Sequence, residues 1–107
     1  MTPVLDISPE QQTLLLRLLQ QFLPNVGVWA FGSRIKGSAR PTSDLDLVVF
    51  AKHTQRSQVF ALQEALEESN LPFKVDLLIW DEIPDNFKST IQNQFIELIA
   101  STGMSHT

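Results

Sequence analysis

Hydrophobic positions near the N-terminus of the chain repeat at the spacing of an α-helix. The repeating stripe consists of Leu14, Leu15, Leu18, Leu19 and Phe22. Just before it, Ser8 can act as N-cap, Pro9 suits the first helical position, and Gln11 completes the spacing of a capping box. Pro24 and Asn25 end the pattern. We therefore expect a first amphipathic helix that starts at Pro9 and packs its leucines onto a core.

Three later segments have the composition of β-strands, rich in β-branched, aromatic and leucine side chains. They are Val26–Phe31, Asp44–Phe50 and Phe73–Trp80. A short helix of one or two turns is expected after Gly32, with Ser33 as its N-cap. Thr54–Ser69 is predicted as a helix. A last helix is predicted after Pro84, with one apolar face formed by Phe87, Ile91, Phe95, Leu98 and Ile99.

This alternation of helices and strands predicts an α/β (α+β) fold in which a small three-stranded sheet packs against helices. The chain has 107 residues, which suits one domain with one modest core. We assign residues 1–100 to that domain and residues 101–107 to a flexible polar tail.

Composition narrows the classes of function. The formal net charge is −4, whereas a general nucleic-acid binder usually has an excess of Lys and Arg, so direct nucleic-acid binding is not expected. No apolar run approaches the roughly 20 residues that span a bilayer, and the N-terminus lacks a signal-type stretch. The chain has no cysteine, which excludes disulfides and thiolate metal sites. These features are compatible with the cytoplasm.

The second predicted strand has acidic residues on one face. Side chains alternate along a strand, so Asp44 and Asp46 share a face, and the opposite face is entirely apolar. The third strand follows the same rule, with Asp76 on the face opposite its own apolar face. The apolar faces consist of Leu45, Leu47 and Val49 in the second strand and Phe73, Val75, Leu77 and Ile79 in the third.

Two carboxylates at positions i and i+2 lie about 6–7 Å apart at their Cα atoms, so their oxygens can converge on one cation. Like charges about 4 Å apart repel by about 4 kcal/mol at an effective dielectric near 20, so a positive partner is expected. Mg²⁺ prefers oxygen ligands and commonly binds one or two carboxylates together with phosphates. Two such ions are the usual arrangement for phosphoryl or nucleotidyl displacement.

The segment before the acidic strand suits a phosphate group. Gly32 permits close approach of the backbone, and Ser33 offers a hydroxyl beside backbone N–H groups at a helix start. Arg34 and Lys36 can add charge-assisted contacts, and with Arg40 they form a local basic cluster in an acidic chain. Each feature also has an ordinary explanation: a turn, a solvated loop, or exposed carboxylates on a strand edge.

The order of these features resembles the signature of the DNA polymerase β-like nucleotidyltransferase superfamily. Gly32 and Ser33 are followed, after ten intervening residues, by Asp44-Leu45-Asp46. The short chain and the Val75–Leu78 strand resemble the minimal nucleotidyltransferases, the MntA-type antitoxins of HEPN/MNT modules. The resemblance implies the nucleotidyltransferase fold, with a mixed sheet in which the second strand is central.

The same resemblance implies roles for individual residues. Gly32 and Ser33 would hold the phosphates of ATP, with Arg34 and Lys36 as further phosphate contacts. Asp44, Asp46 and Asp76 would be the catalytic carboxylates and would bind Mg²⁺, with two ions expected. Asp76 would also help to deprotonate the acceptor hydroxyl.

The implied activity is that of a protein adenylyltransferase, which transfers AMP from ATP to a hydroxyl. The expected acceptor is a tyrosine of a partner HEPN toxin, and the expected role is that of the antitoxin in a type VII-like toxin–antitoxin pair. Relatives with other acceptors have extra domains, which residues 51–107 do not provide, so a partner chain or a homodimer is expected. Two alternatives stay open: an antitoxin that masks its toxin by contact alone, and nucleotidyl transfer to a small molecule with the help of a partner subunit.

Overall fold

The computed structural model of the protein describes residues 5–35 and 43–100. The first helix begins as the sequence predicts: the Ser8 hydroxyl accepts from the Gln11 backbone N–H, and the Gln11 side chain accepts from the Ser8 N–H. The helices and strands are α1 (Pro9–Phe22), β1 (Val28–Phe31), β2 (Leu45–Val49), α2 (Arg56–Glu67), β3 (Val75–Ile79), α3 (Asp85–Asn93) and β4 (Ile96–Ile99). Three short 3₁₀ segments complete the described chain: η1 (Ser33–Ile35), η2 (His53–Gln55) and η3 (Trp80–Glu82).

The four strands form one mixed sheet with the order β3-β2-β1-β4. β1 runs antiparallel to β2 and to β4, whereas β2 and β3 are parallel. The expectation of a mixed sheet with the second strand in its interior is therefore confirmed, and so is the α/β class. The described part of the chain contains no helix of the length and apolarity needed to cross a membrane.

The predicted last helix is wrong in its second half, and the sheet has four strands rather than three. The helix ends at Asn93, and Ile96–Ile99 forms β4 along the free edge of β1. Phe95, Ile96, Leu98 and Ile99 fit a helical stripe, but their β-branched and aromatic character also fits a strand. Pairing with β1 settles the choice because it satisfies backbone groups that β1 would otherwise leave open.

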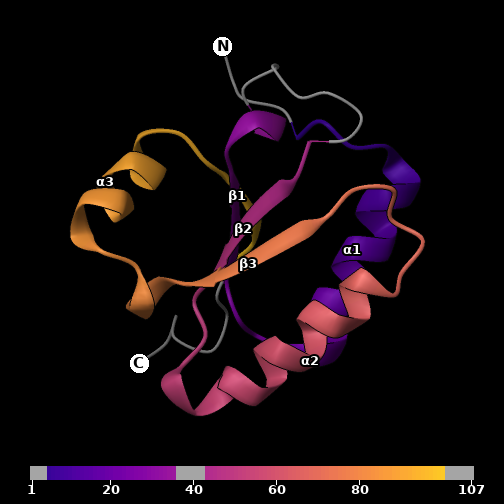
Figure 1. Cartoon of the computed structure of the whole chain (residues 1–107), viewed down its shortest axis with the longest axis horizontal. Coiled ribbons are helices and arrows are strands. Elements are labelled where there is room, and N and C mark those ends of the chain that lie inside the picture. Colours follow the sequence, from indigo (N-terminus) through magenta and orange to yellow (C-terminus); the bar gives the residue numbers. More distant parts are fainter. Residues whose placement is uncertain (1–4, 36–42, 101–107) are drawn as a thin grey trace.

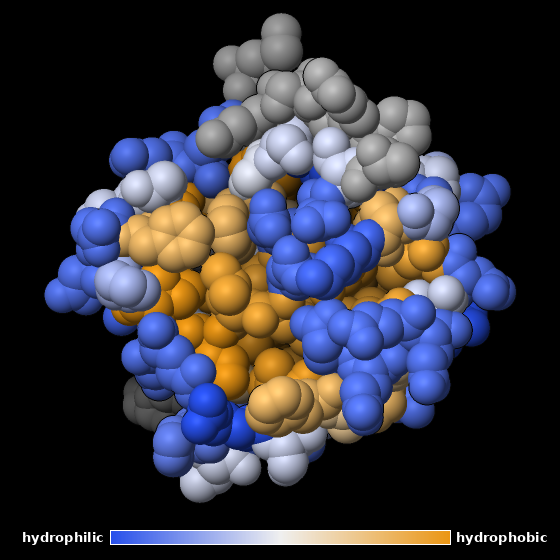
Figure 2. All heavy atoms as spheres, in the orientation of Figure 1, coloured by the Kyte–Doolittle hydropathy of each residue, from blue (hydrophilic) through white to orange (hydrophobic). Residues whose placement is uncertain are grey.

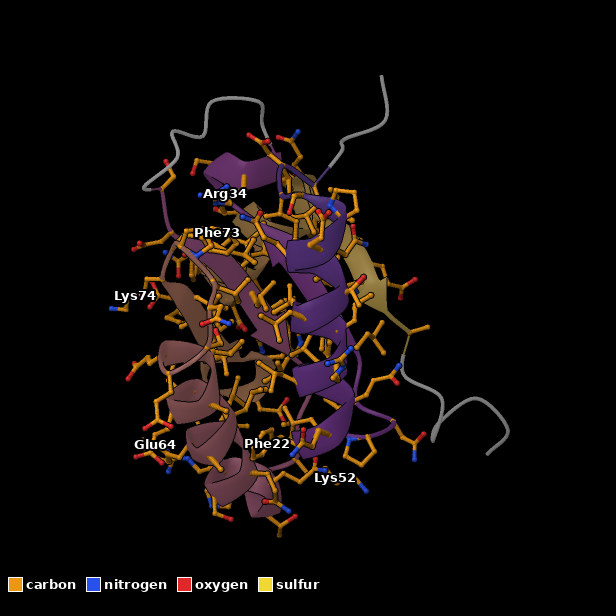
Figure 3. All side chains as sticks on the ribbon, turned by 90° about the vertical axis from the view of Figure 1, so that its right-hand side faces the viewer. Phe22, Arg34, Lys52, Glu64, Phe73 and Lys74 are labelled. Carbon is orange, nitrogen blue, oxygen red and sulfur yellow. The ribbon has the colours of Figure 1, made fainter. Side chains whose placement is uncertain are left out.

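Helices α1 and α2 cover one face of the sheet, and α3 lies toward the other face (Figure 1). Figure 3 looks onto the layer formed by α1 and α2, which lie side by side. The apolar strand faces predicted from alternation point into this layer, and Leu45, Leu47 and Val49 are fully buried. Leu15 and Leu19 of α1 and Leu62 of α2 are fully buried against them.

The opposite face of the sheet has an aromatic cluster near the ends of β2 and β3. Trp29 stacks on Phe95 with ring centroids 3.9 Å apart and meets Phe50 and Trp80 edge to face. Nearer the other end of the same face, Phe31 contacts Phe87 of α3 at 5.8 Å. This packing fixes α3 beside the acidic end of the sheet.

Candidate active site

Asp46 and Asp76 lie side by side where β2 and β3 begin and β1 ends, and Asp44 lies just before β2. In the sheet register Asp46 pairs with Phe31 on one side and with Asp76 on the other, so these three side chains share a face. Asp44 lies two residues before Asp46, immediately before β2, and is exposed. An Asp76 on the far face of the sheet would have contradicted the predicted site; the parallel register puts it beside Asp46 instead.

The carboxylates repel one another across this site. Partial burial, followed by the negative charges of Asp76 and Asp44, raises the pKa of the Asp46 carboxyl. Lys74 approaches Asp76 with its Nζ 3.4 Å from Oδ1, and both side chains are substantially exposed to solvent. Lys74 is a charged neighbour of the site that no sequence motif indicates, although alternation along the strand places it on the same face as Asp76. A cation at Asp46 would relieve the remaining repulsion.

Gly32, directly after β1, lies beside the Asp46 carboxylate. Its φ of +87° lies in the left-handed region that favours glycine. A Cβ built on Gly32 would collide with Oδ2 of Asp46 and lie 3.3 Å from its Cγ. The absence of a side chain at Gly32 therefore makes room for the Asp46 carboxylate itself. Ser33 follows directly, half-buried, at the start of η1.

Arg34 and Lys36 were predicted as phosphate contacts. Lys36 lies outside the described residues. The guanidinium of Arg34 is directed inward: it donates from Nε to the Ser43 carbonyl at 3.0 Å and from Nη1 to the Asp6 carbonyl at 2.8 Å. The residue is 5% exposed and its guanidinium lies 4.1 Å from the centre of the Phe73 ring. Phosphate binding by Arg34 therefore stays a prediction. These contacts are all with other parts of the protein, which indicates a structural role.

The donor set fits a hard divalent cation shared with a ligand. Within residues 5–35 and 43–100, no three acidic or histidine side chains lie close enough to hold a metal ion by themselves. Mg²⁺ commonly retains open positions that substrate phosphates or water fill, so two carboxylates are a sufficient protein contribution. Asp44, Asp46 and Asp76 offer only oxygen ligands and excess negative charge, which suits Mg²⁺ better than a softer metal.

An apolar cavity lies apart from the three aspartates, beside α2. A cavity of about 270 Å³ is formed between α2 and the outer edge of β3. Its lining includes Val59, Phe60, Leu77, Ile79 and Ile83, and none of the three aspartates. A second, more polar hollow of about 360 Å³ is lined in part by Asp44, Phe73 and Lys74. Of these two hollows, the second includes Asp44 in its lining and the first includes none of the aspartates.

Comparison with known proteins identifies the family of the chain. The family described as "Polymerase beta, Nucleotidyltransferase" matches residues 15–102. The chain is 40% identical over 96 residues to a "Probable protein adenylyltransferase MntA" of Haemophilus influenzae, covering 86% of this chain and 82% of the relative.

Solved structures share the fold. A toxin–antitoxin crystal structure with AMP-PNP gives a TM-score of 0.66 at 22% identity, covering 90% of this chain and 77% of the other. A complex of tri-AMPylated Shewanella oneidensis HEPN toxin with MNT antitoxin gives 0.54 at 17% identity, covering 90% and 74%. The family match over residues 15–102 and the 40% identical relative show that the chain is a nucleotidyltransferase and belongs to the polymerase β nucleotidyltransferase family.

Proposed function

We propose that this protein uses Mg²⁺ and ATP to transfer AMP to a hydroxyl group of a HEPN toxin and thereby acts as its antitoxin. The observation that supports this most strongly is the pairing of Asp46 with Asp76 on one sheet face, with Asp44 and the Gly32–Ser33 turn beside them. The relative named as a protein adenylyltransferase and the solved antitoxin–HEPN complex support the choice of donor and partner.

Each residue of the site has a distinct part in this proposal. Asp44 and Asp46 hold Mg²⁺, and Asp76 completes the acidic site and accepts the proton of the acceptor hydroxyl. The Ser33 hydroxyl and the side-chain-free Gly32 backbone receive the β- and γ-phosphates. Mg²⁺, when bound, neutralises the phosphate charge that develops during transfer.

The bond changes follow from this placement. The acceptor oxygen forms a bond to the α-phosphorus of ATP while the bond between that phosphorus and the oxygen bridging to the β-phosphate breaks. Pyrophosphate leaves, and the hydroxyl proton passes to Asp76. Positioning and charge neutralisation account for most of the catalysis in reactions of this type. Lys74, with its Nζ 3.4 Å from Oδ1 of Asp76, offers a positive charge beside that carboxylate.

One observation favours a second function, in which the protein masks its toxin by contact alone. The hollow between α2 and β3 is apolar, and Phe60 at its side is 70% exposed. Figure 2 shows the corresponding apolar surface framed by hydrophilic residues. A contiguous exposed apolar patch that is rimmed by polar residues often marks a protein–protein contact. A contact-only antitoxin would depend on this surface and not on the aspartates. No described feature favours transfer to a small molecule.

The deciding experiment mixes the purified protein with its HEPN partner, Mg²⁺ and ATP labelled at either the α- or the γ-phosphate. We expect the α-label on the toxin, no γ-label, and loss of the toxin's ribonuclease activity. The double variant Asp44→Asn/Asp46→Asn should give neither labelling nor protection. Asp81→Asn, which changes an exposed carboxylate outside the site, is the matched control and should behave as wild type.

Two results would separate the alternatives. Protection by the Asp44→Asn/Asp46→Asn double variant without labelling would favour contact alone. In that case Phe60→Ser should abolish protection. Labelling of the toxin by wild type, retained in the double variant, would contradict the assignment of the carboxylates.

A further inference from the structure

Arg34 joins three segments of the chain, and two of them lead directly into the acidic site. Its Nε donates to the carbonyl of Ser43, which directly precedes Asp44. Its guanidinium lies over the ring of Phe73, three residues before Asp76, with Cζ 4.1 Å from the ring centre. Figure 3 shows Arg34 and Phe73 together at the end of the sheet where these strands begin.

The third segment is the one that precedes α1. Arg34 Nη1 donates to the Asp6 carbonyl at 2.8 Å, and the Asp6 N–H donates to the Arg34 carbonyl at 2.8 Å. This reciprocal pair fixes both the backbone and the side chain of Arg34. Because Ser33 is the preceding residue, the same contacts fix the end of the proposed phosphate-binding turn.

The starts of β2 and β3 are themselves joined at this point. The Leu45 N–H donates to the Lys74 carbonyl at 2.8 Å. Leu45 follows Asp44 on one strand, and Lys74 follows Phe73 on the other. Arg34 therefore contacts both segments, at Ser43 and at Phe73, just before the first hydrogen bond that joins β2 and β3. A shift of either strand would change the separation of Asp46 and Asp76, which face each other one position further on.

We propose that Arg34 is a positioning residue for nucleotidyl transfer: its inward-facing guanidinium fixes the Ser33 turn and the starts of β2 and β3, and so sets the distance between the phosphate site and the three aspartates. This inference rests on the proposed function. It assigns to Arg34 a role through the protein backbone and not through a contact with phosphate.

The chemistry of the contacts requires arginine. A guanidinium presents several donors in a rigid planar fork and stacks on an aromatic ring, so one side chain can bind two carbonyls and a ring at once. A lysine has one compact ammonium on a flexible stem and cannot reproduce that geometry, although it keeps the charge. The hydrogen bonds from Arg34 to the carbonyls of Ser43 and Asp6 are part-buried and charge-assisted, and such bonds are stronger than neutral ones.

The test compares Arg34→Lys with wild type and with Arg17→Lys, which replaces an exposed arginine of α1. Three quantities are measured: hydrogen exchange at the Leu45 amide, affinity for an ATP analogue with a methylene bridge between the α- and β-phosphorus, and the kcat and KM of AMP transfer to the HEPN partner. We expect about tenfold faster exchange at Leu45 in Arg34→Lys, the factor that corresponds to losing one charge-assisted hydrogen bond. We expect kcat to fall about tenfold to a hundredfold, because a misplacement of about 1 Å has effects of that size.

Affinity for the analogue and the KM for ATP should change by less than about threefold, since the charge is retained and the phosphate contact lies elsewhere. Arg17→Lys should match wild type in all three measurements. A large loss of analogue affinity with unchanged exchange at Leu45 would overturn the inference and establish Arg34 as a phosphate contact. An unchanged kcat would also overturn it.

A second variant covers the case in which Arg34→Lys does not fold. Phe73→Leu leaves Arg34 in place and removes the ring beneath it, so a smaller change in the same direction is expected in both exchange and kcat. No change in either quantity would contradict the inference. If wild type itself transfers no AMP, the proposed function fails, while exchange and analogue binding still test the role of Arg34.

Discussion

Gly32→Ala offers the sharpest single-atom test of the site. The substitution adds one methyl group at a residue whose φ is +87°, and that group would collide with Oδ2 of Asp46. A non-glycine residue in the left-handed region costs about 1–2 kcal/mol. At about 4–8 °C per kcal/mol for a domain of this size, the melting temperature should fall by about 5–15 °C.

The effect on activity should exceed the effect on folding. To accommodate the new methyl group, either Asp46 must rotate or the Gly32–Ser33 turn must move. Either change alters the position of the Asp46 carboxylate relative to the proposed phosphate site. We expect AMP transfer to the HEPN partner to fall by about tenfold to a hundredfold below the melting temperature of the variant. Calorimetry gives the stability term, and transfer of α-labelled phosphate at saturating ATP gives the catalytic term.

Asn25→Ala is the matched control. Asn25 is the described non-glycine residue with positive φ, at +65°, and it lies after α1, away from the aspartates. The variant should lose about 1 kcal/mol of stability for a similar backbone reason while retaining wild-type transfer. Equal losses of activity in the two variants, or full activity in Gly32→Ala, would refute the collision argument.

Three further changes test the electrostatics and the sheet edge. The raised pKa of Asp46 means that the folded protein keeps this proton to higher pH than the unfolded chain, whose carboxyl has its ordinary value of 3.8, so stability falls as the pH rises through that window. Asp46→Asn should therefore raise the metal-free melting temperature at pH 7. Wild type should gain about 1.4 kcal/mol in free energy of unfolding when the Mg²⁺ concentration is about ten times the Kd for Mg²⁺, and Asp46→Asn should lose this gain. An equal gain in both proteins would exclude Asp46 as a ligand. Lys74→Met removes the cation that pairs with Asp76 and competes with Mg²⁺ for its carboxylate, so Mg²⁺ binding measured by titration calorimetry should become tighter. Weaker binding would contradict this competition. Gln63→Leu removes two hydrogen bonds to the backbone of β3 and should cost about 1–2 kcal/mol in urea unfolding, in contrast to Gln58→Leu at an exposed position of the same helix.

The amino-acid sequence by itself determined the features that depend on neighbouring residues. The capping box at Ser8 and Gln11, the apolar faces of β2 and β3, and the spacing of Gly32 to Asp46 all follow from local patterns. Helical and strand periodicities place side chains on faces without any knowledge of the fold. For this reason the class of the fold, the acidic face and the family resemblance were accessible from the sequence.

Only the tertiary structure decided which distant segments meet. The segment Ile96–Ile99 fits a helical and a strand pattern equally well, and the open edge of β1 selects the strand. The inward orientation of Arg34 depends on Asp6, Ser43 and Phe73, which come from three separate parts of the chain. The register that places Asp76 beside Asp46 is likewise a long-range pairing. Such choices minimise the number of unsatisfied backbone groups and buried charges in the whole molecule, a quantity that no local stretch of sequence contains.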